Sequence, residues 1–187
     1  MRCDVNLTTQ VRDVVNEIKW KALDGLVLVG HSYGGVVISG VAEQVLDRIA
    51  CVIYKDAAIP KDGESFADLA PGMDVGGATI PAPPTSEGDY VSEADRAWVD
   101  SKATPQPTAT FTEKIRLTGA YERVPNKIYI RAARGPDFFD AVADRMRSLR
   151  DSTVYDVAAG HDIEIDAPEE LSMVLAASAG HGLQART

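Results

Sequence analysis

The sequence contains few of the residues that disulfide-rich or metal-binding proteins need. Its 187 residues include two cysteines, Cys3 and Cys51, and three histidines. Cys3 stands near the terminus and Cys51 lies in an apolar stretch, so we expect no disulfide, and neither cysteine has the spacing of a metal ligand. This cysteine usage fits a reducing compartment, and we therefore expect the protein to be cytoplasmic.

Basic residues and long apolar runs are also scarce. Nineteen Lys and Arg stand against 28 Asp and Glu, a formal net charge of −9. Nucleic acids and anionic membranes both need a basic face, so the composition argues against either as the main partner. No apolar run approaches the ~20 residues of a membrane span, and the first residues lack the apolar segment of a signal peptide. The length and hydrophobic content suit one globular domain.

The most informative stretch lies at residues 25–38. Residues 26–29 are all apolar, a pattern typical of a parallel strand covered on both faces. Gly30-His31-Ser32-Tyr33-Gly34 then matches G-x-S-x-G, in which the serine sits at the tip of a sharp strand-to-helix turn. We expect Gly30 and Gly34 to crowd each other there, which would require glycine at both positions. The following helix would direct its N–H groups to the same point, where a negative oxygen can be stabilised.

A serine nucleophile needs a base that accepts its proton and an acid that orients the base. In strand–turn–helix enzymes these residues follow the chain order Ser, acid, His. Of the three histidines, His161 follows the last predicted strand, where the base would have to be. Asp137, after the third predicted strand, is the favoured acid, and Asp56, after the second, is the alternative.

The oxyanion that forms during such a reaction needs two hydrogen-bond donors. One is the backbone N–H of Tyr33, the residue after the serine. The other normally comes from a loop after an earlier strand, often with the sequence His-Gly, and no such loop precedes Gly25. The side chain of His31, next to the serine, is expected to leave on the far side of the turn.

Strand and helix patterns alternate over most of the chain. Predicted strands cover residues 49–54, 127–130 and 153–158 besides 26–29, and predicted helices cover 7–20, 35–46, 138–149 and 168–179. Thr8 or Thr9 is expected to cap the first helix. This order predicts an α/β fold with a mostly parallel sheet of about four strands and flanking helices.

Residues 60–124 break this alternation. Seven of the ten prolines fall there, together with Gly76-Gly77. We expect an insertion over the active face, a cap or lid, with a disordered linker as the alternative interpretation. The expected organisation is therefore a core formed by residues 1–59 and 125–187, and a cap formed by residues 60–124.

Several stretches, taken together, resemble the α/β-hydrolase superfamily. The chain is most similar to the branch of small bacterial esterases related to pyrethroid hydrolases, plant methyl esterases and hydroxynitrile lyases. The matching stretches run through nearly the whole chain and comprise residues 4–9, 27–35, 54–60, 62–65, 97–100, 104–107, 160–162 and 168–171.

The resemblance implies Ser32 as the nucleophile, His161 as the base and the Tyr33 N–H as an oxyanion donor. It also implies a cap over residues 60–124 that shapes an apolar acyl or alcohol pocket. Trp98 is a candidate lining residue of that pocket, and we count His31 with it as a candidate substrate-binding residue. Neither a metal nor an organic cofactor is implied.

The chain departs from this family at its front. Members begin with a strand and a His-Gly loop, then another helix and strand, before the segment that matches Asp4. We therefore expect the chain to be N-terminally truncated, to lack half of the oxyanion hole, and to leave the strand at 26–29 with an unpaired edge. A second copy or a partner chain is expected to cover that edge, which would make the protein a homo-oligomer.

The function expected first is that of a serine carboxylesterase, which hydrolyses a small hydrophobic ester through an acyl-serine intermediate. One alternative is a lyase of the hydroxynitrile type, which would use the same three residues for acid and base catalysis. The other is a non-catalytic remnant of the fold that acts in binding or assembly, an interpretation motivated by the missing front.

Overall fold

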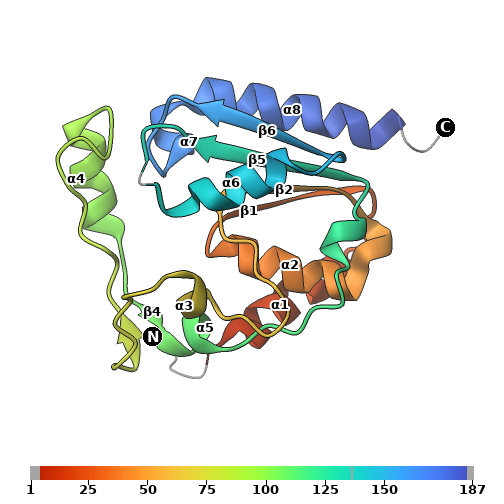
Figure 1. The fold of residues 1–187 in the computed structure, drawn as a ribbon, viewed down its shortest axis with the longest axis horizontal. Helices are drawn as coiled ribbons and strands as arrows, with labels where there is room; N and C mark the ends of the chain where they lie inside the picture. Colours follow the sequence, from red (N-terminus) through yellow and green to blue (C-terminus); the bar gives the residue numbers. More distant parts are fainter. Residues whose placement is uncertain (1–4, 136, 185–187) are drawn as a thin grey trace.

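A four-stranded parallel sheet forms the centre of the protein (Figure 1). The computed structural model describes residues 5–135 and 137–184, with side chains except at 137 and 179–184. The strand order is β1-β2-β5-β6, and all three pairings are parallel. The strands are β1 (Leu26–Ser32), β2 (Ile49–Ala57), β5 (Asn126–Ala132) and β6 (Ser152–Val157). The predicted α/β fold is confirmed, and its predicted strands lie within a few residues of the observed ones.

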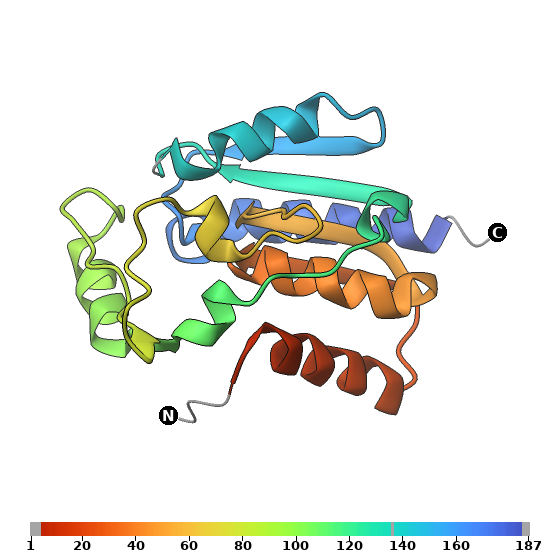
Figure 2. The ribbon, with the colours of Figure 1, turned by 60° about the horizontal axis from the view of Figure 1, so that its bottom comes forward.

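Helices cover both faces of the sheet (Figure 2). Along β2, Val52 and Tyr54 pack into the core on one face, whereas Cys51 and Ile53 pack into a second core on the other face. This arrangement explains why β2 is apolar without alternation. The first face carries α1 (Leu7–Trp20), α2 (Gly34–Val45) and α6 (Asp140–Arg147), and the second carries α7 (Ile163–Asp166) and α8 (Pro168–Gln184). Two short 3-10 turns, η1 (Leu46–Arg48) and η3 (Asp137–Phe139), precede β2 and α6.

Helix α1 begins at a capping box. Asn6 is the N-cap, and its Oδ1 accepts a hydrogen bond from Thr9 N at 2.9 Å, while Thr9 Oγ1 accepts one from Asn6 N at 2.8 Å. The N-cap itself is therefore Asn6, the extended residue before the helix, and the expected capping by Thr9 occurs from inside the helix as the second half of the capping box. The predicted bounds of this helix, 7–20, are confirmed.

Strand β1 lies at the edge of the sheet, as expected, and helices cover both of its faces, as its apolar sequence predicted. Leu26 and Leu28 pack against the first core, and Val27 packs against the second. Among the described residues it pairs only with β2, so Leu26, Val27 and Leu28 remain half-exposed and Val29 is 42 % exposed. An open apolar edge of this kind invites pairing with another chain. The expected homo-oligomer stays a prediction, which size-exclusion chromatography with light scattering can test.

The segment 60–124 holds short elements that connect β2 with β5. They are α3 (Phe66–Leu69), β3 (Thr79–Ile80), α4 (Glu93–Lys102), β4 (Gln106–Pro107), α5 (Thr108–Thr112) and the 3-10 turn η2 (Tyr121–Arg123). Strands β3 and β4 form an antiparallel pair, and α4 projects at one side of the core (Figures 1 and 2). The division into core and cap stays a prediction.

Two further expectations concern cysteines and membranes. Cys51 is a free, buried thiol, whereas Cys3 lies outside the described residues. Burial raises the pKa of the Cys51 thiol to about 11, so it stays protonated at neutral pH and packs as a small apolar side chain. In the described part of the chain, no helix combines the length and the apolar character that crossing a bilayer requires.

Candidate active site

The turn between β1 and α2 holds Ser32 in a strained backbone conformation. Its φ is +54°, a region that side-chain-bearing residues rarely adopt. The turn is tight enough that a Cβ on Gly30 would lie 2.6 Å from the carbonyl oxygen of Gly34, so residue 30 must be glycine. The strand, sharp turn and helix expected around Ser32 are all present. We call residues 30–35 the serine turn.

The second glycine that the serine turn requires is Gly35 rather than Gly34. A Cβ on Gly34 would meet nothing within 4 Å, whereas a Cβ on Gly35 would lie 2.1 Å from the carbonyl oxygen of Ala58. The expectation that Gly34 needs to be glycine for lack of space is therefore wrong. The first turn of α2 packs against the residues just after β2, and this contact determines which position must be glycine.

His161 lies in the turn after β6, and its ring is held by a buried carboxylate. His161 Nδ1 and Asp56 Oδ2 are 2.6 Å apart, and Asp56 Oδ1 accepts a hydrogen bond from Ala132 N at 3.2 Å. The pairing of β1 with β2 skips Asp56, since His31 pairs with Lys55 and Ser32 pairs with Ala57. Asp56 is thus the extra residue of a bulge, with φ +40°.

The structure pairs the histidine with Asp56, which was the alternative acid from the sequence. A ring nitrogen makes one strong hydrogen bond, and Asp56 takes that of Nδ1, so the geometry favours Asp56 over the preferred Asp137. Asp137 begins η3, and its side chain lies outside the described residues. A sequence signal was available: Lys55 and Asp56 together interrupt an apolar run over residues 49–59, and a carboxylate buried there needs a partner.

The hydroxyl of Ser32 is not engaged by another described residue. Ser32 Oγ has no hydrogen-bond partner within the described part of the chain, although the Ser32 carbonyl accepts from Ala58 N at 3.1 Å. Tyr33 follows at the N-terminus of α2, and its hydroxyl donates to Gln10 Oε1 at 2.7 Å. The Ser32 main chain is therefore bonded to the residue that follows β2, and the neighbouring Tyr33 side chain is bonded to α1, while the Ser32 side chain remains available.

The ring of His31 lies against the ring of His161, with centroids 4.4 Å apart. His31 Nε2 is 3.1 Å from the backbone carbonyl of His161, and because a carbonyl only accepts, Nε2 carries the hydrogen. Burial, and after it the neighbouring His161 and Lys55, lower the pKa of His31 to about 4. The expectation that this side chain leaves on the far side of the turn is wrong, because the His31 ring packs against the ring of the proposed base.

A polar network surrounds these two histidines. The ammonium of the buried Lys55 donates to Glu164 Oε2, and the hydroxyl of Tyr90 donates to Asp162 Oδ2. His31, Asp162 and Glu164 place one potential metal-ligating atom each within 4.8 Å of one another, so they are the described residues that could hold a cation. However, the Lys55 ammonium already neutralises Glu164, so the group is better described as an internally satisfied polar network.

Aromatic rings connect the serine turn with His161. Tyr33 contacts Phe66 and Phe111, Phe66 contacts Phe138, and Phe138 contacts Phe139, with centroid separations between 4.6 and 6.4 Å. Phe139 then stacks on His161 at 5.8 Å. Sequence reasoning missed this apolar run, because its members are spread over residues 33–139 and only the fold brings them together.

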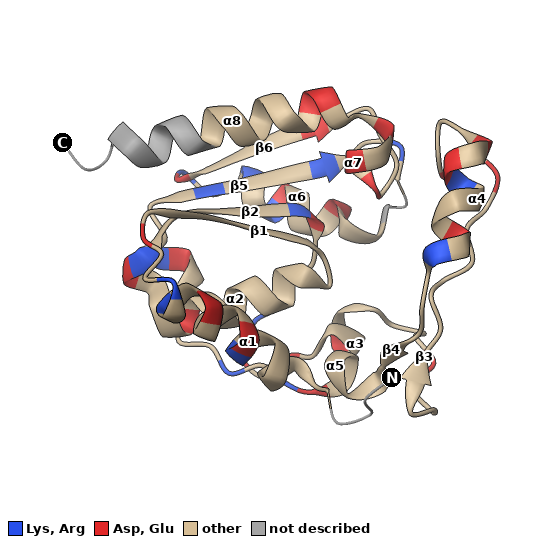
Figure 3. Ribbon diagram, turned by 180° about the vertical axis from the view of Figure 1, so that it is seen from behind, with Lys and Arg blue, Asp and Glu red and all other residues tan. Residues whose placement is uncertain are grey.

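Trp98, the other candidate substrate-binding residue, lies on α4 with 57 % of its surface exposed. Figure 3 shows acidic residues, coloured red, on α4 and α7. Those closest to His161 have cationic or hydroxyl partners, as described above for Glu164 and Asp162. The roles of Trp98 and His31 in substrate binding stay predictions.

Comparison with known proteins agrees with this architecture. The family model described as "Alpha/beta hydrolase family" matches residues 2–174. A carbendazim hydrolyzing esterase from Nocardioides sp. (strain SG-4G) is 33 % identical over 192 residues, which cover 93 % of this chain and 79 % of that protein.

Solved structures give the same fold. An extracellular alpha/beta-hydrolase from a Paenibacillus species superposes with a TM-score of 0.82 at 25 % identity, covering 95 % of this chain and 81 % of the other. A pyrethroid hydrolase from Sphingobium faniae JZ-2 superposes with a TM-score of 0.70 at 22 % identity, covering 94 % and 78 %. With a family match over nearly the whole length, the chain belongs to the alpha/beta hydrolase family.

Proposed function

We propose that the protein is a serine carboxylesterase in which Ser32, His161 and Asp56 form the catalytic triad. The observation that carries this proposal is the 2.6 Å contact between His161 Nδ1 and the buried Asp56 Oδ2. It leaves Nε2 of the imidazole as the atom that can accept a proton, at the same edge of the sheet where β1 presents Ser32. The carboxylic ester hydrolase class expected from the sequence is supported by the family and by the esterase relative.

The reaction would proceed in two transfers. Ser32 Oγ attacks the ester carbonyl carbon while His161 accepts the hydroxyl proton, and the imidazolium then protonates the departing alcohol. Water attacks the acyl-serine in the second transfer, giving its proton to His161, which returns a proton to Ser32 as the acid leaves. Because catalytic hydrogen bonds often tighten only when substrate binds, an unpaired Ser32 Oγ is compatible with this sequence of steps.

Charge that develops on the carbonyl oxygen needs donors that are already in place. The backbone N–H of Tyr33 follows Ser32 directly and belongs to the N-terminus of α2, where the helix dipole favours negative charge. The Ser32 carbonyl accepts a hydrogen bond from Ala58 N, and the side chain of Tyr33 is tied to Gln10 on α1. We therefore assign Tyr33 N–H as one oxyanion donor.

The surroundings of the triad support a neutral, hydrophobic ester as the substrate. The aromatic run from Tyr33 to Phe139 offers apolar surface beside both the nucleophile and the base. Phe138 is the exposed member of the run, at 42 %. The segment 60–124 supplies Phe66 and Phe111 to it, which supports the interpretation of this segment as a cap that shapes the substrate site.

The test combines active-site labelling with turnover. A fluorophosphonate probe should form an adduct on Ser32 of the wild-type protein, and p-nitrophenyl esters should be hydrolysed. Ser32→Ala should lose both signals, with a drop in kcat of roughly 10⁴-fold or more. A wild-type protein that forms no adduct, or a Ser32→Ala variant that still hydrolyses the ester, would overturn the proposal. Cyanohydrin cleavage without ester turnover would instead identify the lyase.

A further inference from the structure

The carboxylate of Asp166 binds three separate segments of the chain. Its Oδ2 accepts hydrogen bonds from Gly160 N at 2.8 Å and from Arg134 Nη2 at 2.6 Å. Its Oδ1 accepts one from Val91 N at 2.9 Å. The side chain is 1 % exposed, and these donors compensate for the hydration that the carboxylate loses on burial.

One of these donors belongs to the turn that carries His161. Gly160 directly precedes His161, and Arg134 also donates from Nε to the carbonyl of Ala158 at 3.1 Å. Asp166 and Arg134 therefore hold the chain on the N-terminal side of the histidine. We call residues 158–162 the histidine turn.

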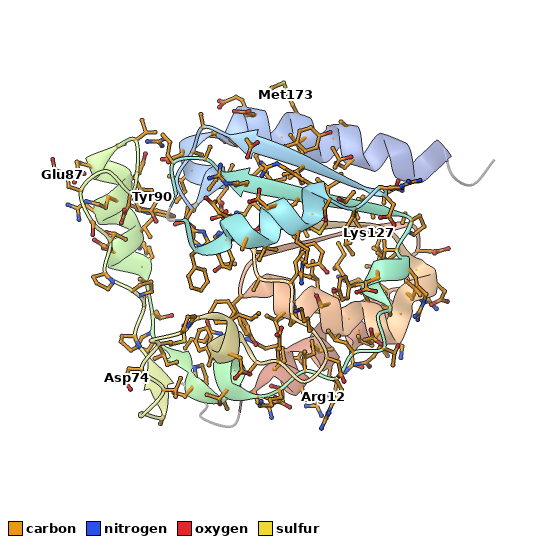
Figure 4. The ribbon with its side chains drawn as sticks, viewed as in Figure 1. Arg12, Asp74, Glu87, Tyr90, Lys127 and Met173 are labelled. Carbon is orange, nitrogen blue, oxygen red and sulfur yellow. The ribbon has the colours of Figure 1, made fainter. Side chains whose placement is uncertain are left out.

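The histidine turn is held on its other side by residues 89–91, which we call the strap. The hydroxyl of Tyr90 donates to Asp162 Oδ2, and a Cβ on Gly160 would lie 2.2 Å from the carbonyl oxygen of Asp89. The strap leads at once into α4, whose N-cap is Ser92. Tyr90, labelled in Figure 4, lies between α4 and the body of the protein.

We propose that Asp166 and Tyr90 are positioning residues, which lock the strap onto the histidine turn and so fix where His161 stands relative to Asp56. Asp166 acts before the histidine, through Gly160 N, and Tyr90 acts after it, through the Asp162 carboxylate. The contacts from Val91 N to Asp166 and from Tyr90 to Asp162 join the strap to α7 and to the histidine turn, so the segment that leads into α4 is attached to the turn of the catalytic base. This inference rests on the proposed esterase function for its kinetic consequence, but its structural consequence is independent of turnover.

The expected effect is large because the reaction rate depends strongly on the positions of the reacting groups. A displacement of about 1 Å in a reacting group costs on the order of 10²-fold in rate. Asp166→Asn removes the negative charge that pairs with Arg134. It also replaces one carboxylate oxygen with an amide NH₂ group, which would face an N–H donor instead of accepting a hydrogen bond from it. We expect kcat to fall roughly 10- to 100-fold with KM changed less than about threefold. Tyr90→Phe, which removes a single hydroxyl, should act in the same direction and less strongly.

A matched control separates positioning from general stability. Asp151→Asn makes the same chemical change in a carboxylate that pairs with the buried Lys127. Lys127, labelled in Figure 4, lies at the end of the sheet opposite to Tyr90. Asp151→Asn should therefore lower stability and leave kcat and KM near their wild-type values.

The decisive measurement is proton NMR of the hydrogen bond between His161 and Asp56, together with kcat and KM. The downfield Nδ1 proton resonance should weaken or shift in Asp166→Asn and in Tyr90→Phe, and stay unchanged in Asp151→Asn. If Asp166→Asn fails to fold, Tyr90→Phe gives the result alone. An unchanged resonance and kcat in Tyr90→Phe, or equal losses in Asp151→Asn, would overturn the inference. An inactive wild type that shows this NMR pattern would refute the esterase proposal only.

Discussion

The two turns that carry the reacting groups are built in different ways. The serine turn is shaped mainly by its own backbone: Ser32 has φ +54°, and Gly30 closes against Gly34 four residues later. The histidine turn is shaped by distant groups, among them Asp56, Asp166 and Tyr90. A Cβ added to Gly30 or Gly35 in the serine turn should thus act on folding, whereas a change around the histidine turn should act on catalysis.

Because of this difference, the two turns should also tolerate different substitutions. The serine turn has no room for a Cβ at position 30, so no other residue can replace glycine there. The histidine turn depends on hydrogen bonds that converge from several elements, so each partner contributes a share and can be removed singly. The four predictions below test this comparison, beginning with the largest expected effect.

Asp56→Asn should leave the fold intact and reduce kcat by roughly 10³- to 10⁴-fold, because an amide can hold His161 in the wrong tautomer. Ester hydrolysis and circular dichroism measured on the same samples check this. Asp140→Asn serves as the control, since Asp140 is a carboxylate that pairs with Arg131 and does not contact His161. If Asp56→Asn retained most of its activity, His161 would take its orientation from another group.

Gly35→Ala should destabilise the protein by about 3 kcal/mol, because the new Cβ would meet the Ala58 carbonyl oxygen at 2.1 Å. Gly34→Ala should be neutral or stabilising by up to ~1 kcal/mol, since its Cβ meets nothing and alanine favours the helix. Urea unfolding of both variants measures the difference. Equal losses in the two variants would contradict the assignment of Gly35 as the required glycine.

The pH dependence of stability should reveal His31. Its pKa of about 4 in the folded protein lies below the ordinary value of 6.5, so the unfolded chain binds the proton more readily. The stability that neutral His31 contributes is complete above pH 6.5 and is lost as the pH falls towards 4. Between pH 7 and 4.5 the wild type should lose roughly 2 kcal/mol more than His31→Asn. Parallel stability curves for the two proteins would show that His31 is not held neutral.

Trp98→Ala should have the smallest effect and should disturb neither turn. Trp98 is 57 % exposed on α4, so its loss should change stability by less than about 0.5 kcal/mol. If it lines the substrate site, KM should rise roughly fivefold at unchanged kcat. Trp20→Ala is the matched control, because Trp20 is 88 % exposed on α1. A fall in kcat for Trp98→Ala would mean that α4 acts on the base through more than the strap.

Some features of the site could be predicted from the sequence because they depend on short stretches. The motif around Ser32 needs five consecutive residues, and His161 follows from the order of strands and the scarcity of histidines. The acid could not be selected in this way, since Asp56 and Asp137 both follow a strand and only a bulge in β2 separates them. The unpaired edge of β1 was expected only from the resemblance to the family, because the apolar pattern of a strand does not show how many neighbouring strands it pairs with.

The chain's own order of residues determined the parallel sheet, the strained serine and the identity of the base, since local sterics and apolar periodicity act over a few residues. The tertiary structure alone decided that Asp56 supports the histidine, that Gly35 rather than Gly34 must lack a side chain, and that the strap reaches Asp162 and Asp166. Each of these joins groups from different elements. Such contacts depend on where strands end and on how helices pack against the sheet, and a local sequence pattern does not contain this information.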